Sequence, residues 1–462
     1  MRPLVRRLGI VALILAFAGL AAAWVAWSRL TRQHTPGELI RHAQKRLIGH
    51  DRLEAVATPF LLRAQQRWER SPPAGLPALG KGQQTKPNVD ATPVGDIVPV
   101  ADVEALTKAM RMAMPGQTIE IAPGRYEIER PLQTGQAGRA GRPITLRAAV
   151  TGTVTLEIRS QVGFVASQPW WIFENLNLRG ACAADEQCEH AFHVVGKAGH
   201  TVIRNNRIED FNAHIKVNGV GADWPDHGLI SFNTLKNSMA RSTYRSVTPV
   251  DIVGANAWRV ADNLIANFVK SGGDRISYGL FMKGGGRDGR IERNLIVCTP
   301  QGISSPGARV GISFGGGGTG QGSCRDGRCV AEHTGGIASQ NVVAHCNDFG
   351  IDINRSWQIA VAYNTLINTA GIDVRNAAGG VRVVGNLVEG RIRARDASEM
   401  LPSVNELGRL ADWLEAPDAL DLRWRRQPET IPAATALGND FCHAPRRPVT
   451  LPGAVDGEPT CR

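Results

Sequence analysis

Four basic side chains lie in short apolar segments, and their types suit proton transfer beside a negative charge. Lys283 ends the segment YGLFMK, Lys216 and His214 lie in AHIKVN, and Arg309 precedes VGISF. A lysine becomes a base when burial or a neighbouring cation lowers its pKa, and a histidine needs less adjustment. An arginine can hold a carboxylate through two parallel hydrogen bonds. Together these residue types favour abstraction of a proton next to a carboxylate, with Lys283, Lys216 or His214 as the base.

Further polar residues share these segments and alternate with apolar ones. Alternate residues of a strand point to opposite faces, so the apolar residues fix which side chains point outward. Stacked segments would then present a polar stripe with neighbours ~5 Å apart, along which a linear sugar chain could lie. The alternative is a solvated face with weak ion pairs, and a core position for the loop residue Trp224. Besides the four basic residues, the predicted contact residues are His193, Trp224, Asp251, Ser313, Asp352, Asn354, Asp373 and Arg375.

A sequence repeat must position this stripe. An asparagine followed closely by aliphatic residues recurs at 175, 206, 233, 263, 294, 341, 364 and 386, at intervals of 22 to 47 residues. The intervening segments are rich in Val, Ile and Leu on a period of two, and each is too short to bury its own apolar face. Stacked repeats of this kind predict an all-β fold, a single right-handed parallel β-helix of about eight or more coils. We expect the asparagines to form an inward ladder in which each amide bonds to the next.

The longest interval contains GGGGTGQGSCRDGRC, which the shorter repeats lack. Four successive glycines resemble a phosphate-binding loop, but no Lys-Ser or Lys-Thr pair follows them. We therefore expect an inserted loop at the edge of the polar stripe.

The β-helix is predicted over residues 97–396, with a cap at each end. Asp102 can cap an amphipathic helix that contains Val103, Leu106 and Met110, and this helix would close the first coil. Residues 397–462 are expected to form a C-terminal cap, helical between Ser398 and Trp424. Residues 31–70 are predicted to be a helical stalk interrupted near Gly49 and Pro59, and the Pro/Gly-rich residues 71–96 a linker.

The amino-terminal segment has the length of a membrane span. Leu8 to Ser28 is a run of 21 residues without a charge, and a bilayer crossing needs about 20. This predicts a transmembrane anchor within residues 1–30; a signal peptide cleaved near GLAAA is the alternative. Basic residues flank the segment on both sides, so the distribution of charge does not settle its orientation.

Eight cysteines indicate an oxidising compartment. The positions predict four local pairs: Cys182–Cys188, Cys298–Cys346, Cys324–Cys329 and Cys442–Cys461. Cys298 and Cys346 occupy nearly equivalent places on consecutive coils, within disulfide reach. Zinc is the weaker interpretation, because no two cysteine pairs have finger spacing. We expect a single-pass protein of a bacterial inner membrane with its body in the periplasm; secretion is the alternative.

The positive charge is concentrated near the amino terminus. The net charge is +11, of which residues 1–70 carry +8 and the remaining 392 residues only +3. Anionic lipid headgroups are the natural partner of such a basic stalk. The nearly balanced body lacks the basic face of a nucleic-acid binder.

The entry segment EALTKAMRMAMPGQTIEIAPGRYEI, followed by GRPITLRA, resembles the opening of right-handed β-helix polysaccharide lyases. The resemblance is closest to the family of chondroitinase B and alginate lyases, and it covers residues 97–390. It implies a catalytic role for Lys283, because Lys283 precedes Asn294 by 11 residues, a separation in sequence similar to that in the family. The family's Leu-Arg-His-Gly motif is absent, and its calcium-binding acids correspond to Tyr278 and Ile276, so calcium is possible but its family ligands are missing.

The expected function is therefore β-elimination on an anionic, uronate-containing polysaccharide. A C5-epimerase would share the first proton abstraction, and a glycoside hydrolase would use carboxylates such as Asp251, Asp352 and Asp373. A different class remains open, a glycan-binding or envelope scaffold protein without catalysis.

Overall fold

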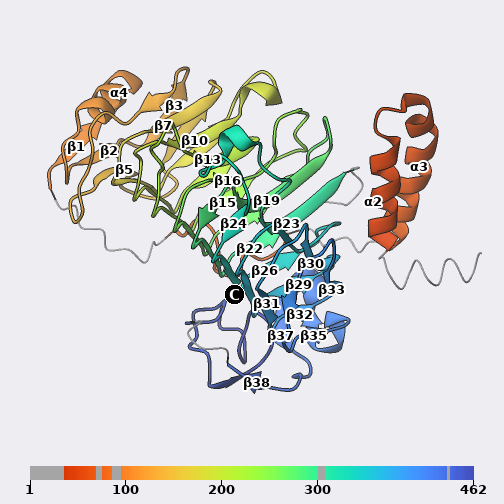
Figure 1. Cartoon of the computed structure of the whole chain (residues 1–462). Coiled ribbons are helices and arrows are strands. Elements are labelled where there is room, and N and C mark those ends of the chain that lie inside the picture. The colour runs from red at the N-terminus through yellow and green to blue at the C-terminus, as the bar shows by residue number, and fades with distance from the viewer. Residues whose placement is uncertain (1–35, 69–74, 86–94, 300–306, 434–437, 462) are drawn as a thin grey trace, which may run out of the picture.

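The structure, a computed structural model, describes residues 36–68, 75–85, 95–299, 307–433 and 438–461. Most of these residues coil into parallel strands that form three long sheets (Figure 1). Successive coils add one strand to each sheet in turn, so hydrogen-bonded neighbours within a sheet belong to adjacent coils. This confirms the predicted parallel solenoid, and the parallel strands are consistent with a right-handed β-helix.

The three sheets are named A, B and C here. Within the described residues, sheet A has the order β1(Ile97–Val100), β2(Thr118–Ile121), β5(Ile144–Ala148), β8(Trp171–Glu174), β11(Val202–Arg204), β14(Leu229–Ser231), β17(Arg259–Ala261), β21(Arg290–Glu292), β25(Ile337–Ser339), β28(Ala360–Ala362), β31(Val381–Val384), β34(Met400–Leu401). Sheet B has the order β3(Gly124–Ile128), β6(Val154–Ile158), β9(Asn177–Gly180), β12(Arg207–Glu209), β15(Thr234–Lys236), β18(Leu264–Ala266), β22(Leu295–Val297), β26(Val342–Ala344), β29(Thr365–Ile367), β32(Leu387–Val388), β35(Glu406–Leu407). Sheet C has the order β4(Leu132–Gln133), β7(Val162–Ala166), β10(His190–Val195), β13(Ala213–Asn218), β16(Val250–Val253), β19(Ile276–Lys283), β23(Ala308–Phe314), β27(Ile351–Asn354), β30(Gly371–Arg375), β33(Arg391–Ala394).

The core lies inside the coil and consists of columns of identically placed apolar side chains. In sheet C each column member pairs in register with the next, and all are at most 1% exposed. Because branched and aromatic side chains stack on themselves at the strand spacing, each coil completes the core of its neighbour. One such column comprises Phe164, Phe192, Ile215, Val250, Leu280, Ile312, Ile351 and Ile372.

The asparagine ladder forms as predicted from Asn206 to Asn386. Each side-chain amide donates to the amide oxygen of the next coil at 2.9 to 3.1 Å, and these residues are fully buried. Asn405 extends the ladder by one coil, accepting from Asn386 at 2.8 Å. The ladder pins the turn between sheets A and B in every one of these coils, and therefore fixes the register of the whole stack.

The assignment of Asn175 to this ladder is wrong by one residue. The ladder position of its coil is Leu176, whose backbone N–H donates to Asn206. Asn175 instead has a φ of 64° and bonds to Asn205, which has a φ of 54°. The residue before each ladder position is left-handed, and asparagine tolerates that conformation better than most residues. Two turn positions favour asparagine here, and the sequence pattern alone does not separate them.

Helix α4(Val103–Met112) closes the first coil. The Asp102 side chain accepts from the Ala105 N–H at 2.7 Å, and Leu106 and Met110 are fully buried against the coil. The predicted amino-terminal cap of the β-helix is therefore confirmed.

The carboxy-terminal cap is not helical between Ser398 and Trp424, contrary to the prediction. The described residues form the last strands of sheets A and B, the 3-10 turns η3(Leu410–Asp412) and η4(Pro417–Ala419), and the short pairs β36(Leu414–Ala416)–β37(Asp421–Trp424) and β38(Ile431–Pro432)–β39(Val449–Thr450). Pro402 and Pro417 interrupt any long helix, and the apolar residues of this segment serve contact with the coil instead.

This carboxy-terminal segment covers the outer face of sheet B. Leu410, Trp413 and Phe441 pack on Leu295 and other outward apolar residues of that sheet. Residues 75–85, part of the predicted linker, lie on the same face: Leu79 joins this cluster, and the buried Lys81 pairs with Asp262 at 3.0 Å. That part of the linker prediction is wrong. Among the described residues, the apolar cluster that these two segments form includes residues of sheet B and none of sheet C.

The stalk forms a hairpin of α2(Pro36–Leu47) and α3(Asp51–Trp68), which stands beside the β-helix in Figure 1. The break near Gly49 is confirmed, whereas Pro59 lies inside α3 and does not end it, contrary to the prediction. Glu54 of α3 pairs with Arg275 of the body. The predicted anchor within residues 1–30 lies outside the described residues. Among the described helices, none is long and apolar enough to cross a membrane.

Candidate active site

The outer face of sheet C presents a row of polar side chains in register. His193, Lys216 and Asp251 pair in order on β10, β13 and β16, and Ser313, Asp352 and Asp373 pair in order on β23, β27 and β30. Phe281 of β19 joins the two halves, because it pairs with both Asp251 and Ser313. The predicted outward register is therefore correct, with an aromatic residue in the middle of the row.

A cleft of about 640 Å³ opens at one half of this face, where β13, β16 and β19 end. Its floor contains Lys216, Asn218 and Lys283. Residues 315–327, the glycine-rich loop of the predicted insertion, form the opposite wall, and Trp224 closes one side. Lys216, Lys283 and Trp224, singled out from three separate parts of the sequence, thus line one cavity.

Lys283 has the environment of a lysine with a suppressed charge. Its Nζ donates to the carbonyl of Gly318 at 2.9 Å and lies 4.4 Å from the centre of the Phe281 ring. Burial lowers the pKa of Lys283; Asp251 opposes this shift, and Lys216 adds to it. A lower pKa makes the neutral amine, the form that accepts a proton, accessible at a lower pH.

Lys216 and His193 form the second polar group of the cleft region. Lys216 Nζ lies 2.9 Å from the carboxylate of Asp251, and the Lys216 side chain is 22% exposed. His193 Nε2 bonds to Asn218 Oδ1 at 2.8 Å, which orients the amide at the end of β13. Burial lowers the pKa of His193. Lys216 thus brings an ion-paired cation into the cleft with Lys283, and His193 supports Asn218 from the adjacent strand β10.

The wall of the cleft is held by a buried carboxylate. Glu332 accepts from the backbone N–H groups of Gly284 and Thr319, at 3.0 and 2.8 Å, and from the Thr319 hydroxyl at 2.7 Å. At the start of the loop, the Ser313 hydroxyl accepts from the Gly316 N–H, and the Asn354 amide donates to the Gly316 carbonyl. Ser313 and Asn354, predicted to touch a ligand, therefore fix the loop.

Trp224 is held in place from two sides. Gly254, at a φ of 72°, lies so close to its ring that an added Cβ would sit 2.0 Å from a ring carbon. On the other side Arg325 of the glycine-rich loop lies 5.3 Å from the ring centre. Arg325 also pairs with Asp226 through two bonds of 2.7 and 2.9 Å. The disulfide Cys324–Cys329 constrains the same loop.

His214 cannot serve as the base, contrary to the prediction. It is fully buried, its Nε2 lies 3.1 Å from the Lys236 carbonyl, and burial lowers its pKa to about 4. Strand alternation places His214 on the outer side of β13, but the ring of Phe211 packs edge-on against it and the side chain bonds to the Lys236 carbonyl.

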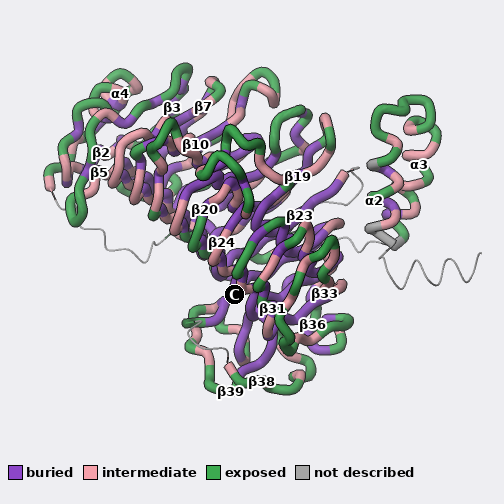
Figure 2. The backbone as a smooth tube through the Cα atoms, viewed as in Figure 1, coloured by how far each residue is buried: buried purple, intermediate pink, exposed green. Residues whose placement is uncertain are grey.

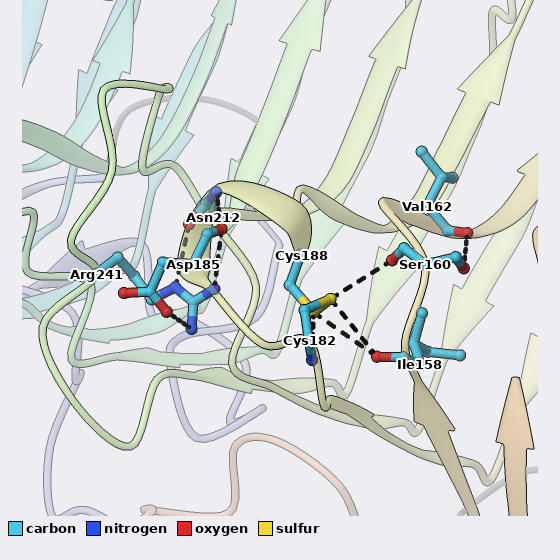
Figure 3. Close-up of a disulfide and its surroundings, with 8 residues drawn as sticks. All are labelled: Ile158, Ser160, Val162, Cys182, Asp185, Cys188, Asn212 and Arg241. Carbon is cyan, nitrogen blue, oxygen red and sulfur yellow. Dashed lines mark hydrogen bonds and ion pairs between the residues drawn. A yellow bond between two sulfur atoms is a disulfide. The ribbon is translucent and has the colours of Figure 1, made fainter. Parts of the chain in front are cut away.

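Figure 3 shows the disulfide loop beside Asn212, the residue that precedes β13. The disulfide Cys182–Cys188 brackets η1(Asp185–Gln187), and Asp185 reaches Arg241 at 2.8 Å. Asn212 links both residues, donating to the Asp185 carbonyl and accepting from Arg241. This network ties two loops over the start of β13, and such long-range cover is not encoded in strand alternation.

Arg309 also lies away from the cleft. It is 1% exposed, and its backbone N–H donates to Asn347 at 2.9 Å. The predicted clamp for a substrate carboxylate is therefore not available at this position.

The other half of the row is a closed ion-pair cluster. Arg375 pairs with Asp352 at 2.7 and 2.9 Å, and Asp373 pairs with Arg393 at 2.6 Å and with Arg395 at 2.9 Å. Both carboxylates are fully buried, and burial raises the pKa of Asp352. The prediction that Asp352, Asp373 and Arg375 contact a ligand is not supported by this arrangement.

The sequence pattern does not identify two residues of the cleft region, Arg325 and Glu332. A basic residue inside a disulfide loop next to a glycine run is the signal that could have identified Arg325. The role of Glu332 depends on long-range contacts and has no local signal.

The donor set does not match a family-type calcium site. The positions five and seven residues before Lys283 hold Tyr278 and Ile276, and burial raises the pKa of Tyr278. In the described parts of the chain, no group of three or more His, Cys, Asp or Glu side chains is arranged to hold a metal ion. Calcium dependence stays a prediction without assigned ligands.

The four predicted disulfides all form, between Cys182 and Cys188, Cys298 and Cys346, Cys324 and Cys329, and Cys442 and Cys461. The pair Cys298–Cys346 links the ends of two consecutive coils, with Cα atoms 4.9 Å apart.

Comparison with known proteins shows the fold. The crystal structure of pectate lyase Pel9A matches with a TM-score of 0.55 and 12% identity, covering 79% of this chain and 97% of that one. A rhamnogalacturonan lyase matches with a TM-score of 0.42 and 12% identity, over 68% and 87% of the two chains. An alginate lyase from Paenibacillus sp. str. FPU-7 matches at 0.39 and 12%, over 68% and 97%. No protein-family model and no curated protein matches the chain. The likeness to pectate lyase confirms the predicted resemblance to β-helix lyases at the level of the fold.

Proposed function

We propose that the protein is a lyase that cleaves an anionic, uronate-containing polysaccharide by β-elimination in the cleft of sheet C. The observation that carries this proposal is Lys283: burial lowers its pKa, and its amine lines a cavity of about 640 Å³ together with Lys216 and Trp224. The likeness of this chain's fold to that of pectate lyase Pel9A supports the proposal.

The proposed reaction begins at the C5 carbon of a bound uronate. Lys283 in its neutral form removes the C5 proton, the C4–O bond to the neighbouring sugar breaks, and a C4–C5 double bond forms. The resulting Lys283 ammonium returns the proton to the departing oxygen, so one residue serves as base and then as acid. The Gly318 carbonyl accepts a hydrogen bond from Nζ in either protonation state and keeps the group in place.

The other cleft residues bind and orient the sugar. Lys216 is partly exposed and can share its ammonium between Asp251 and the substrate carboxylate, whose neutralisation acidifies the C5 proton. The Trp224 ring, held between Gly254 and Arg325, lines the cleft and provides an apolar edge for the sugar. These contacts explain why an anionic sugar would be preferred over a neutral one.

The hydrolase alternative lacks its two carboxylates. Asp352 and Asp373 are fully buried in arginine pairs, and Asp251 is paired with Lys216. A C5-epimerase shares the first step and differs only in where the proton returns. A glycan-binding protein without catalysis would use the same cleft but leave the sugar unchanged.

We also propose that the chain is anchored in a bacterial inner membrane by its apolar segment between Leu8 and Ser28, with the body in the periplasm. The four disulfides support an oxidising compartment. Secretion after cleavage of the same segment is the alternative, and mass spectrometry of the amino terminus of the mature protein distinguishes the two.

The activity test is incubation of the full-length protein with polygalacturonate, alginate and chondroitin sulfate. β-Elimination gives unsaturated ends with a new ultraviolet absorbance. New reducing ends without that absorbance would indicate hydrolysis, altered uronate stereochemistry would indicate epimerisation, and unchanged polymer would reject catalysis on these substrates.

A further inference from the structure

The turns that lead from sheet C to sheet A form a second row of side chains beside the cleft. The backbone N–H after each row member donates to the carbonyl of the next member, at 2.8 to 3.0 Å. The short strands β20(Gly286–Arg287) and β24(His333–Thr334) belong to this row, and exposed residues follow at Arg287 and Asp288 (Figure 2). Neighbouring members are thus about 4.8 Å apart. The row comprises Asp226, Asn256, Arg287, Thr334 and Trp357.

A trough of about 570 Å³ follows this row. Trp357 lines this trough and is 48% exposed, which is unusual for a large aromatic side chain. The next coil contributes Gly379 to the row, and a Cβ at that position would meet nothing within 4 Å. The end of the row next to the Trp357 ring is therefore left without a side chain, and the position is open to solvent.

The trough has the polar groups that an acidic sugar requires. Arg287 is exposed, and within the described residues its guanidinium has no ion pair, so it can bind a carboxylate with two hydrogen bonds. Asn256 and Gln358 provide amides for hydroxyl groups. The nearby Asp326 carboxylate accepts from the backbone N–H groups of Arg328 and Cys329, which satisfies part of its charge.

The trough and the cleft are neighbours, because Arg325 lines both of them. Arg325 is fixed between them by its pair with Asp226 and its bond to the Gly254 carbonyl at 3.1 Å. An extended sugar chain in the cleft that passes Arg325 would reach the trough, whose row has a spacing close to the length of one sugar unit.

We propose that this trough is an additional binding subsite for the same anionic polysaccharide, with Trp357 stacking on a sugar ring and Arg287 holding a uronate carboxylate. The inference rests on the proposed function, since it assigns the trough to a chain that extends out of the catalytic cleft. The row Asn256–Arg287–Thr334–Trp357 lies on the turns and is distinct from the outward row of sheet C.

The test compares long and short substrates with the full-length protein and its Trp357→Ala and Arg287→Gln variants. Loss of one aromatic stacking contact corresponds to about a fivefold loss of affinity. We expect KM for polygalacturonate or alginate to rise about fivefold in each variant, and this rise to disappear as the substrate is shortened until it no longer reaches from the cleft to the trough. Tyr244→Ala and Arg130→Gln, which remove an exposed aromatic and an exposed arginine elsewhere, serve as matched controls.

Binding is measured independently by retardation of each variant in native gels that contain polygalacturonate or alginate. If both variants turn over the polymers with the KM of the wild type, the subsite is overturned and the proposed lyase activity is not. Retardation that depends on Trp357, without turnover of any substrate, supports the subsite and overturns the proposed lyase activity. If the protein shows neither retardation nor turnover, both the subsite and the lyase activity are overturned.

Discussion

The two halves of the outer face of sheet C share strand register but differ in ion pairing and cover. In the open half Lys216 pairs with Asp251, Lys283 bonds to a backbone carbonyl and has no ion pair among the described residues, and the glycine-rich loop stands off far enough to leave a cavity. In the closed half arginines pair with Asp352 and Asp373 at short range, and both carboxylates are fully buried. An outward position on a β-helix therefore does not make a site by itself. A site also needs a charged group that is not held in an ion pair and a loop that leaves space above it.

The closed half should respond mainly in stability. Arg375→Ala leaves the buried carboxylate of Asp352 without its main partner, and removal of one member of a buried pair costs about 3 kcal/mol. The free energy of unfolding, measured by urea denaturation, should fall by that amount.

The exposed pair Arg125–Glu157 gives the matched control, because Arg125 is 65% exposed on its side chain. Arg125→Ala should have little effect on unfolding. Equal urea midpoints for Arg375→Ala and the wild type would show that the closed half is not a stabilising cluster.

The open half should respond first through its wall. Glu332→Ala removes the acceptor of two backbone N–H groups and one hydroxyl, at a cost of about 2 kcal/mol of local stability. We expect faster proteolytic cleavage within residues 315–327 and a lower kcat/KM.

The exposed Glu129 provides a control that lies far along the chain from this loop. Cleavage of Glu332→Ala at the rate of Glu129→Ala would mean that Glu332 does not hold the wall.

The pH dependence of activity should report the environment of Lys283 in the open half. Asp251 raises and Lys216 lowers the pKa of Lys283, while burial lowers it below the ordinary value of 10.5. The plot of kcat/KM against pH should therefore rise with an inflection below 10.5, as the neutral amine forms. Asp251→Asn should move the inflection to lower pH, and Lys216→Met should move it to higher pH. Shifts in the reverse directions would contradict this description of the cleft.

Stability should change with pH in the same sense. A lysine whose folded pKa lies below its unfolded value binds fewer protons when folded, so stability rises with pH between the two values. Below the lowered pKa the full penalty for charging Lys283 is present. Lys283→Met should remove this part of the pH dependence, which urea denaturation at several pH values would detect.

The features that the sequence predicted correctly are those set by local periodicity. The strand register, the ladder from Asn206 to Asn386 and the helix after Asp102 follow from repeats and caps. The pair Cys298–Cys346 follows from equal places on adjacent coils. The failures concern cover by distant segments. The burial of His214 and the packing of the carboxy-terminal segment on sheet B depend on contacts between residues far apart in the chain, which a period of two does not describe.

The predictions for the candidate site succeed and fail for the same reasons. Alternation placed Lys216 and Lys283 on the correct face, and both line the cleft. It also placed Asp352 and Asp373 there, but it gave no information on the arginines that bury them. Arg325 comes from an insertion without a repeat, so no periodicity could assign it to the cleft.

The most direct test of the central claim is the turnover of uronate polymers by Lys283→Ala. Lys283 is partly buried, so far-ultraviolet circular dichroism and urea unfolding must first show that the variant is folded. The account predicts a fall in kcat of at least about 100-fold, no rescue by Lys283→Arg because guanidinium stays protonated, and polymer retardation close to that of the wild type. A folded Lys283→Ala variant with near-normal turnover would contradict the account and transfer the base to Lys216 or His193.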